Sequence, residues 1–201
     1  MSDHVTITRN PGAANASFET IDTTQGEMVY WKNEDTEAHW PIFSAVTPAV
    51  TLNFQAGPLT NSDSLQPSLG NTASASPAVI TQGTSVTVSY TCKLHSGEAG
   101  TINVWADFRS QPNQMAGATH GQAYSANLTI GGKPPYTFQV SNSNLPASLT
   151  VKDVKNAQGV DQGLYVSGTP GSGDTGSFAF DLTCEDALEN NITQTYLLTV
   201  S

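Results

Sequence analysis

The chain has 201 residues, with 17 acidic side chains against 7 basic ones and a formal net charge of −10. This length allows one large β domain or two smaller domains, each with its own core. The few, scattered Lys and Arg residues argue against a nucleic-acid partner, because phosphate binding needs clustered positive charge. No apolar run approaches the roughly 20 residues that span a bilayer, so no membrane span is expected.

Alternating apolar and polar residues recur along the chain and predict an all-β protein. Turn-forming clusters such as Asn10-Pro11-Gly12 separate the alternating segments, which is typical of a β-sandwich. The apolar positions of the segments, in chain order, are Val5 and Ile7; Val29 and Trp31; Val50, Leu52 and Phe54; Val86, Val88, Tyr90 and Cys92; Ile102, Val104, Ala106 and Phe108; Ala126, Leu128 and Ile130; Tyr136, Phe138 and Val140; Phe178, Phe180, Leu182 and Cys184; and Tyr196, Leu198 and Val200.

The alternation lapses over residues 109–122, a polar stretch with one Pro and two Gly. Such a composition is typical of a linker. We therefore predict a first domain over 1–108, a linker over 109–122 and a smaller second domain over 123–201. Cys92 and Cys184 then lie on inward faces of strands in different domains, so we expect two reduced thiols.

The first residues, Met1 to His4, lack the basic and apolar regions of a secretory signal peptide. Either the protein is cytosolic or the chain begins after a removed signal. The composition, low in charge and rich in Ser, Thr, Asn and Gly, favours an extracytoplasmic protein that is periplasmic, secreted or on the cell surface.

The segment with the clearest chemical content runs from Tyr90 to Ile102. A strand ends at Cys92, His95 follows three residues later, and a Gly-rich turn leads into the next strand. A thiolate and an imidazole at this spacing can converge on one metal ion. A second imidazole, His39, lies upstream, after the strand around Val29.

These two segments resemble the motifs of the cupredoxins, the blue-copper β-sandwich family. The first reads Val29-Tyr30-Trp31-Lys32-Asn33-Glu34-Asp35 before His39, and the second reads Tyr90-x-Cys92-x-x-His95-x-x-Glu98-x-Gly100-x-Ile102-x-Val104. The resemblance covers about residues 1–108. It implies a Greek-key β-sandwich with one mononuclear copper, held by His39, Cys92 and His95. It also implies one-electron transfer with a protein redox partner, and no enzymatic activity.

Two residues depart from the family pattern. Glu98 stands where the family has its weak axial Met, and Trp40 follows the first His where many members carry an Asn. Glu98 is therefore either a fourth copper ligand or a solvated loop carboxylate. The Trp40 departure leaves the usual hydrogen bonds between the two ligand loops in question.

Alternatives to the copper site remain open from the sequence. Zinc also fits a Cys, two His and a Glu, and a metal-free sandwich with a buried thiol needs no ion at all. Glu34, Asp35 and Glu37 beside His39 could steer a basic redox partner, or be solvated charges in a turn. An enzyme with further copper centres is not expected, because His4 and His120 are the remaining histidines.

Residues 123–201 resemble the Ig-like domain that occurs, often in tandem, in bacterial surface and secreted proteins. The similarity rests on Gly132-Lys133-Pro134-Pro135-Tyr136-Thr137-Phe138, on Leu145-Pro146, on Val166-Ser167-Gly168-Thr169-Pro170 and on Tyr196-Leu197-Leu198-Thr199-Val200. It implies a spacer or adhesion module. The leading hypothesis is thus a copper electron-transfer domain joined to this module. The alternatives are a protein that stores or delivers copper and a metal-free structural protein of the cell surface.

Overall fold

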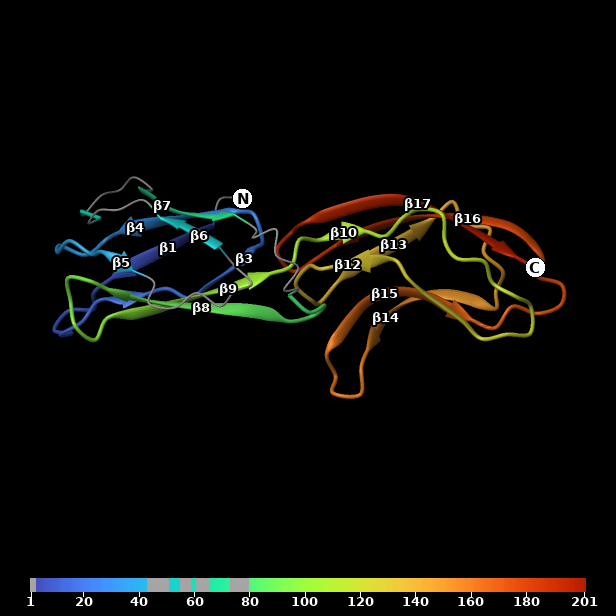
Figure 1. The fold of residues 1–201 in the computed structure, drawn as a ribbon, viewed down its shortest axis with the longest axis horizontal. Coiled ribbons are helices and arrows are strands. Elements are labelled where there is room, and N and C mark those ends of the chain that lie inside the picture. Colours follow the sequence, from blue (N-terminus) through green and yellow to red (C-terminus); the bar gives the residue numbers. More distant parts are fainter. Residues whose placement is uncertain (1–2, 43–50, 55–58, 61–65, 73–79) are drawn as a thin grey trace. The chain divides into compact units, whose positions relative to one another are not determined.

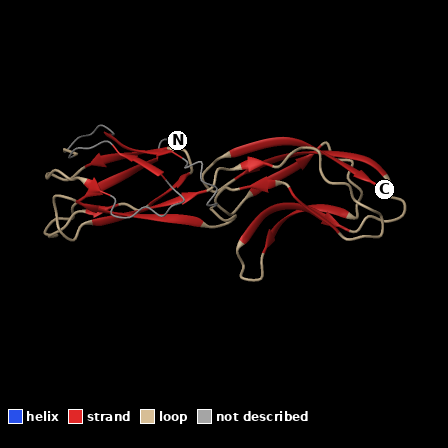
Figure 2. Ribbon diagram, viewed as in Figure 1, coloured by secondary structure: helices blue, strands red, loops and turns tan. Residues whose placement is uncertain are grey.

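The structure, a computed structural model, describes residues 3–42, 51–54, 59–60, 66–72 and 80–201. Within these ranges all regular structure is β-strand (Figure 2). The predicted all-β class is therefore confirmed. Over the same residues, no helix is present that could cross a membrane.

The chain divides into two compact units. The first consists of Met1–Ile80 and Ser85–Trp105, and the second of Thr81–Thr84 and Ala106–Ser201. The boundary falls after β9 (Ala99–Trp105), three residues before the predicted end of the first domain. Phe108, which the sequence pattern assigned to the first domain, is buried in the core of the second unit.

The described residues of the first unit form two sheets (Figure 1). The five-stranded sheet has the spatial order β2 (Ser17–Phe18), β1 (Asp3–Thr8), β4 (Met28–Asn33), β7 (Gln66–Thr72) and β6 (Thr51–Phe54). The four-stranded sheet has the order β3 (Ile21–Thr24), β9, β8 (Ser85–Cys92) and β5 (Pro41–Ile42). The pairs β1–β4 and β3–β9 are parallel, and the other pairs are antiparallel.

The two sheets of this unit pack on each other through the predicted alternating residues. In β8, Val88, Tyr90 and Cys92 are buried while the residues between them are exposed. The Trp31 ring of β4 meets the Tyr90 ring edge-on at a centroid distance of 5.7 Å, which places side chains of both sheets in one core. Burial of large aromatic side chains is the main source of stability in such a sandwich.

The second unit has three small sheets. They are β11 (Tyr124–Asn127), β15 (Asp161–Gly168) and β14 (Leu149–Lys155); β13 (Thr137–Ser141), β16 (Gly176–Glu185) and β17 (Asn191–Val200); and β10 (Arg109–Ser110) with β12 (Thr129–Ile130). All pairs in it are antiparallel. Its core includes Leu128, Leu164, Phe180 and Tyr196, all fully buried.

The prediction of a linker over 109–122 is wrong, because this segment is part of the second unit. Met115 and Ala118 are buried in its core. The backbone N–H of Met115 donates to Leu197 O at 3.0 Å, and that of Ala118 to Thr199 O at 2.9 Å. The segment thus runs along β17 with few regular strand residues. Its backbone groups form hydrogen bonds, but its side chains do not show the apolar–polar alternation by which a strand is predicted from sequence.

The packing of this segment gives a first testable prediction. Met115→Ala should lower the free energy of unfolding by about 2–4 kcal/mol, because it leaves a cavity in a close-packed core. Gln114→Ala, one residue earlier and exposed, should change it by less than about 0.5 kcal/mol. Chemical denaturation of both variants measures the difference. Equal small effects would indicate that the segment is a tether rather than part of the fold.

Candidate metal centre

The pairing of β5 with β8 brings His39 next to Cys92. Pro41 lies opposite Cys92 in this antiparallel pair, so His39, two residues before Pro41, reaches the end of β8. His39 is also held by a β-bridge to Leu59, with backbone hydrogen bonds of 3.0 and 2.6 Å. Two ligand candidates far apart in sequence therefore meet at one end of the sandwich.

The loop between β8 and β9 supplies the other two candidates. It is closed by a hydrogen bond of 2.9 Å from the Cys92 N–H to Glu98 O. Gly97 has φ +90°, a conformation that residues with a Cβ rarely adopt, and this lets the chain turn back within a few residues. The tight turn holds His95 and Glu98 close to Cys92.

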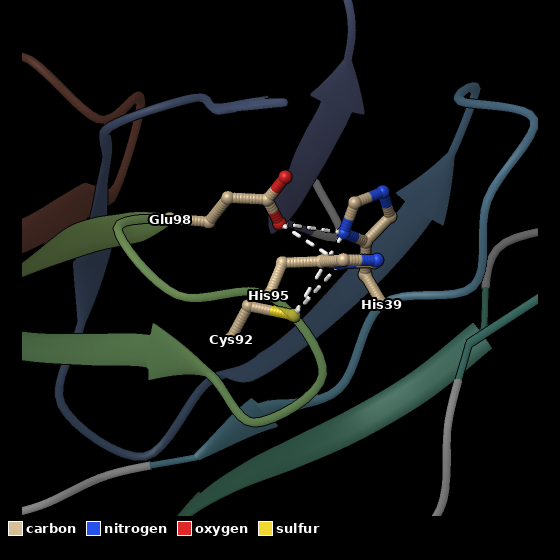
Figure 3. A group of neighbouring side chains, drawn as sticks. All are labelled: His39, Cys92, His95 and Glu98. Atoms are coloured by element: carbon tan, nitrogen blue, oxygen red, sulfur yellow. Dashed lines mark hydrogen bonds and ion pairs between the residues drawn. The ribbon is translucent and has the colours of Figure 1, made fainter. Parts of the chain in front are cut away.

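The side chains of His39, Cys92, His95 and Glu98 point toward one another (Figure 3). One ligand atom from each lies within 4.8 Å of all the others. Cys92 Sγ lies 3.8 Å from His39 Nδ1 and 3.6 Å from His95 Nδ1. Glu98 Oε2 lies 2.9 Å from His39 Nδ1 and 3.3 Å from His95 Nδ1. The structure thus brings all four residues that the sequence singled out into one cluster.

These separations fit a common metal ion. Bonds of roughly 2.0–2.3 Å in a tetrahedral arrangement place neighbouring donor atoms about 3.3–3.6 Å apart. Two of the measured distances, 3.6 and 3.3 Å, fall in this range, and a third is 3.8 Å. A fourth distance, 2.9 Å between His39 Nδ1 and Glu98 Oε2, has the length of a hydrogen bond, and every pair of donor atoms lies within 4.8 Å. The donor set therefore suits a single ion after small side-chain shifts.

Carboxylates hold the outer nitrogen of each imidazole. His39 Nε2 lies 2.8 Å from Asp35 Oδ2, and His95 Nε2 lies 3.2 Å from Glu37 Oε2. A carboxylate that accepts a hydrogen bond from Nε2 keeps the proton on that nitrogen, so Nδ1 is the atom that would bind a metal. At His39 the ion would replace the hydrogen bond between Nδ1 and Glu98 Oε2. Both Nδ1 atoms face the cluster, so both rings are oriented as metal ligands require.

Asp35 is buried, yet its carboxyl stays ionised. Burial opposes ionisation, but hydrogen bonds from the His39 ring, the Arg9 guanidinium and the Thr36 N–H outweigh it. Together they hold the pKa of Asp35 below its ordinary value. An ionised Asp35 can only accept hydrogen bonds, which fixes His39 Nε2 as the donor.

Glu98 is 2% exposed, so the alternative of a solvated loop carboxylate is wrong. Its Oε1 accepts a hydrogen bond of 2.8 Å from the Ala16 N–H, and its Oε2 faces the two imidazoles. The turn preceding β2 covers Glu98 and supplies this N–H. The sequence around Glu98 does not indicate its burial, because Ala16 and Glu98 are 82 residues apart and meet only in the folded protein.

The two ligand loops are tied by backbone groups. The Trp40 N–H donates a hydrogen bond to Cys92 Sγ at 3.4 Å, and the Lys93 N–H donates to Trp40 O at 2.8 Å. Both contacts use main-chain atoms, so they do not depend on which side chain follows His39. The departure at Trp40 therefore does not remove hydrogen bonding between these loops.

Three residues of the cluster's surroundings were not identified as such from the sequence. In the sequence, Asp35 and Glu37 are consistent with steering or solvated charges, and Arg9 belongs to no motif. Arg9 donates from Nε to Asp35 Oδ2 at 2.9 Å and from Nη2 to Glu37 Oε2 at 2.8 Å. The spacing of Asp35 four residues before His39 was the available signal, but loop residues show no periodicity that could indicate contact.

Both cysteines are free, as expected. Cys184 lies in β16 of the second unit, where burial raises the pKa of its thiol to about 12. It is therefore a protonated, buried thiol at neutral pH and serves as a natural control for Cys92 in chemical tests.

Asp35→Asn tests the support that His39 receives. The loss of charge-assisted hydrogen bonds to His39 and Arg9 should cost about 1.5–3 kcal/mol in unfolding free energy. It should also weaken metal binding roughly 10- to 100-fold. Glu34→Gln is the matched control, since Glu34 is exposed and pairs with Lys32. Equal metal affinities of the two variants would contradict a role for Asp35.

Comparisons with known proteins bear mainly on the second unit. Residues 106–201 match the family described as "Putative Ig domain". No curated protein matches the chain. Among solved structures, the chain is similar to protocadherin gamma B2 extracellular cadherin domains 1–5, with 8% identity and a TM-score of 0.40, over 90% of this chain and 38% of that one. It is also similar to domains 3–6 of the same protein, with 11% identity and a TM-score of 0.31, over 100% and 50%. The chain thus spans half or less of either structure.

The match confirms the predicted Ig-like resemblance and extends it to residue 106. This range coincides with the second structural unit, including the segment expected to be a linker. Residues 106–201 are therefore similar to an Ig-like β domain. The cupredoxin resemblance of the first half stays a prediction.

Proposed function

We propose that the first unit binds one copper ion through His39, Cys92, His95 and Glu98, and that the protein transfers single electrons. The observation that carries this is the convergence of the four donor atoms within 4.8 Å. The orientation of both imidazoles by carboxylates supports it further. Copper supplies a one-electron redox change when bound.

The chemistry of the donors favours copper over zinc. A thiolate is a soft donor suited to Cu(I), while imidazoles and a carboxylate suit Cu(II), and divalent copper binds such sites more tightly than zinc. The donors are fixed at strand ends and in a closed turn, and three of them are buried. A site that moves little between oxidation states favours electron transfer over catalysis.

Copper storage or delivery is less well supported. Rapid exchange of an ion needs exposed donors, whereas His39, Cys92 and Glu98 are buried. His95, with 29% of its side chain exposed, is the donor through which electrons would pass to a protein redox partner.

For the second unit we propose a structural or adhesion role, supported by its Ig-domain match. The same match supports a location outside the cytoplasm, either periplasmic, secreted or on the cell surface. A metal-free structural role for the whole chain is the competing proposal, and it requires that the His–Cys–Glu cluster retain no metal.

Copper loading separates these proposals. The metal-free protein is incubated with excess Cu(II), dialysed against a chelator, and analysed for copper content, visible absorption and electron paramagnetic resonance (EPR). We expect one copper per chain and an intense thiolate-to-copper absorption, with reversible reduction. Full loss of copper to the chelator would support the structural role. Retained copper without a reversible redox wave would support storage or delivery.

A further inference from the structure

Arg9 contacts both of the carboxylates that lie against the Nε2 atoms of His39 and His95. It follows β1 directly, with its side chain 21% exposed. Its Nε and Nη2 both lie 2.9 Å from Asp35 Oδ2, and its Nη2 lies 2.8 Å from Glu37 Oε2. These two carboxylates hold His39 and His95, respectively. One guanidinium therefore contacts the partner of each imidazole.

The same side chain is anchored on two other sides. Its Nη1 donates to Ala14 O at 2.9 Å, and its Nη2 lies 3.5 Å from Glu98 Oε1, the oxygen that faces away from the two imidazoles. A guanidinium has its donors in a rigid planar fork, so contacts at both ends fix its orientation. The Asp35 contact also raises the pKa of Arg9, which stays charged at every relevant pH.

We propose that Arg9 is a positioning residue of the metal centre, acting on His39 through Asp35 and on His95 through Glu37. The predicted effect of Arg9 on copper affinity rests on the proposed metal binding. Its effect on the hydrogen bonds of the two imidazoles does not, because these contacts lie within the protein itself. Asp35 is nearly fully buried, whereas the Glu37 side chain is 54% exposed. Without Arg9, Glu37 would have little to hold it against His95, because an exposed pair alone is weak.

Charge and positioning predict opposite effects of removing Arg9. If Arg9 contributes only its positive charge, its loss should strengthen cation binding, because a like charge near the ion is removed. If Arg9 positions the two carboxylates, its loss should weaken binding, because contacts beyond the direct ligands typically contribute 10- to 100-fold in affinity. Lysine keeps the charge but lacks the planar fork, so it separates the two cases.

The experiment compares Arg9→Met, Arg9→Lys, Glu37→Gln and Arg109→Met with the parent protein. Arg109→Met is the matched control, because Arg109 is exposed, lies in the second unit and forms a loose ion pair of 3.9 Å with Asp107. Before copper is added, nitrogen-15 spectra report hydrogen bonding at the ring nitrogens. Arg9→Met should move the Nε2 resonances of both His39 and His95, whereas Glu37→Gln should move mainly that of His95.

Copper affinity and EPR spectra then test the consequence. We expect Arg9→Met and Arg9→Lys to bind Cu(II) about 10- to 100-fold more weakly, with altered EPR parameters, and Arg109→Met to match the parent. Unchanged ring resonances, or Arg9→Met binding as tightly as the parent, would overturn the positioning role. If Arg9→Met fails to fold, Arg9→Lys decides, and parental affinity of that variant would overturn the proposal. A parent that takes up no copper would overturn the proposed function alone, since the ring resonances still test Arg9.

Discussion

Cys92→Ser should abolish the intense visible absorption of the copper-loaded protein. The absorption expected here arises from charge transfer between a thiolate and Cu(II), and Cys92 Sγ is the sulfur in the cluster. Copper affinity should fall by roughly 100-fold or more, because even residues outside the direct ligands contribute 10- to 100-fold. Absorption spectra and chelator competition measure both effects.

The fold should survive this change. Serine is nearly isosteric with cysteine, and its hydroxyl oxygen can accept the Trp40 N–H that now lies 3.4 Å from the sulfur. Cys184→Ser is the control, because Cys184 lies in the second unit with a thiol that burial keeps protonated. Loss of the colour in Cys184→Ser, with its retention in Cys92→Ser, would show that the sulfur ligand was wrongly assigned.

Glu98→Met should raise the reduction potential of the centre and make the copper-loaded protein bluer in colour. A carboxylate is a hard, anionic donor that stabilises Cu(II), whereas a thioether favours Cu(I). Each tenfold weakening of Cu(II) binding relative to Cu(I) binding raises the reduction potential of a one-electron couple by about 59 mV. Voltammetry beside absorption spectra measures the change in the variant against the parent.

Glu98→Met also removes the acceptor of the buried Ala16 N–H, which should cost about 1–3 kcal/mol in unfolding free energy. Glu98→Gln separates the two effects. Its amide oxygen can still accept from Ala16, but its side chain is neutral, so its potential should lie between those of the parent and Glu98→Met. Identical potentials and spectra for all three proteins would show that Glu98 is not a ligand and that the centre has three protein donors.

The sequence was informative wherever a regular strand positions the residue. The alternation in β8 identified Cys92 as inward-facing, and the short turn after it kept His95 and Glu98 within reach. His39 needed a long-range pairing, that of β5 with β8, which spacing alone does not specify. The family-like motifs around Trp31 and Tyr90 supplied that link.

The surroundings of the cluster were harder to predict, because they depend on loops that meet only in the folded protein. Arg9 contacts Asp35 and Glu37 across more than 25 residues, and Glu98 is covered by the turn at Ala16. Irregular loops carry no periodicity from which burial could be inferred. The segment around Met115 shows the same effect in the second unit, since it is packed into the core without an alternating pattern.

The most direct test of the copper centre is an anomalous difference map, recorded at the copper edge, from crystals of the copper-loaded protein. We predict one strong peak per chain, within bonding distance of Cys92 Sγ and of the Nδ1 atoms of His39 and His95. Absence of a peak at this cluster, or a peak elsewhere on the chain, would contradict the proposed centre.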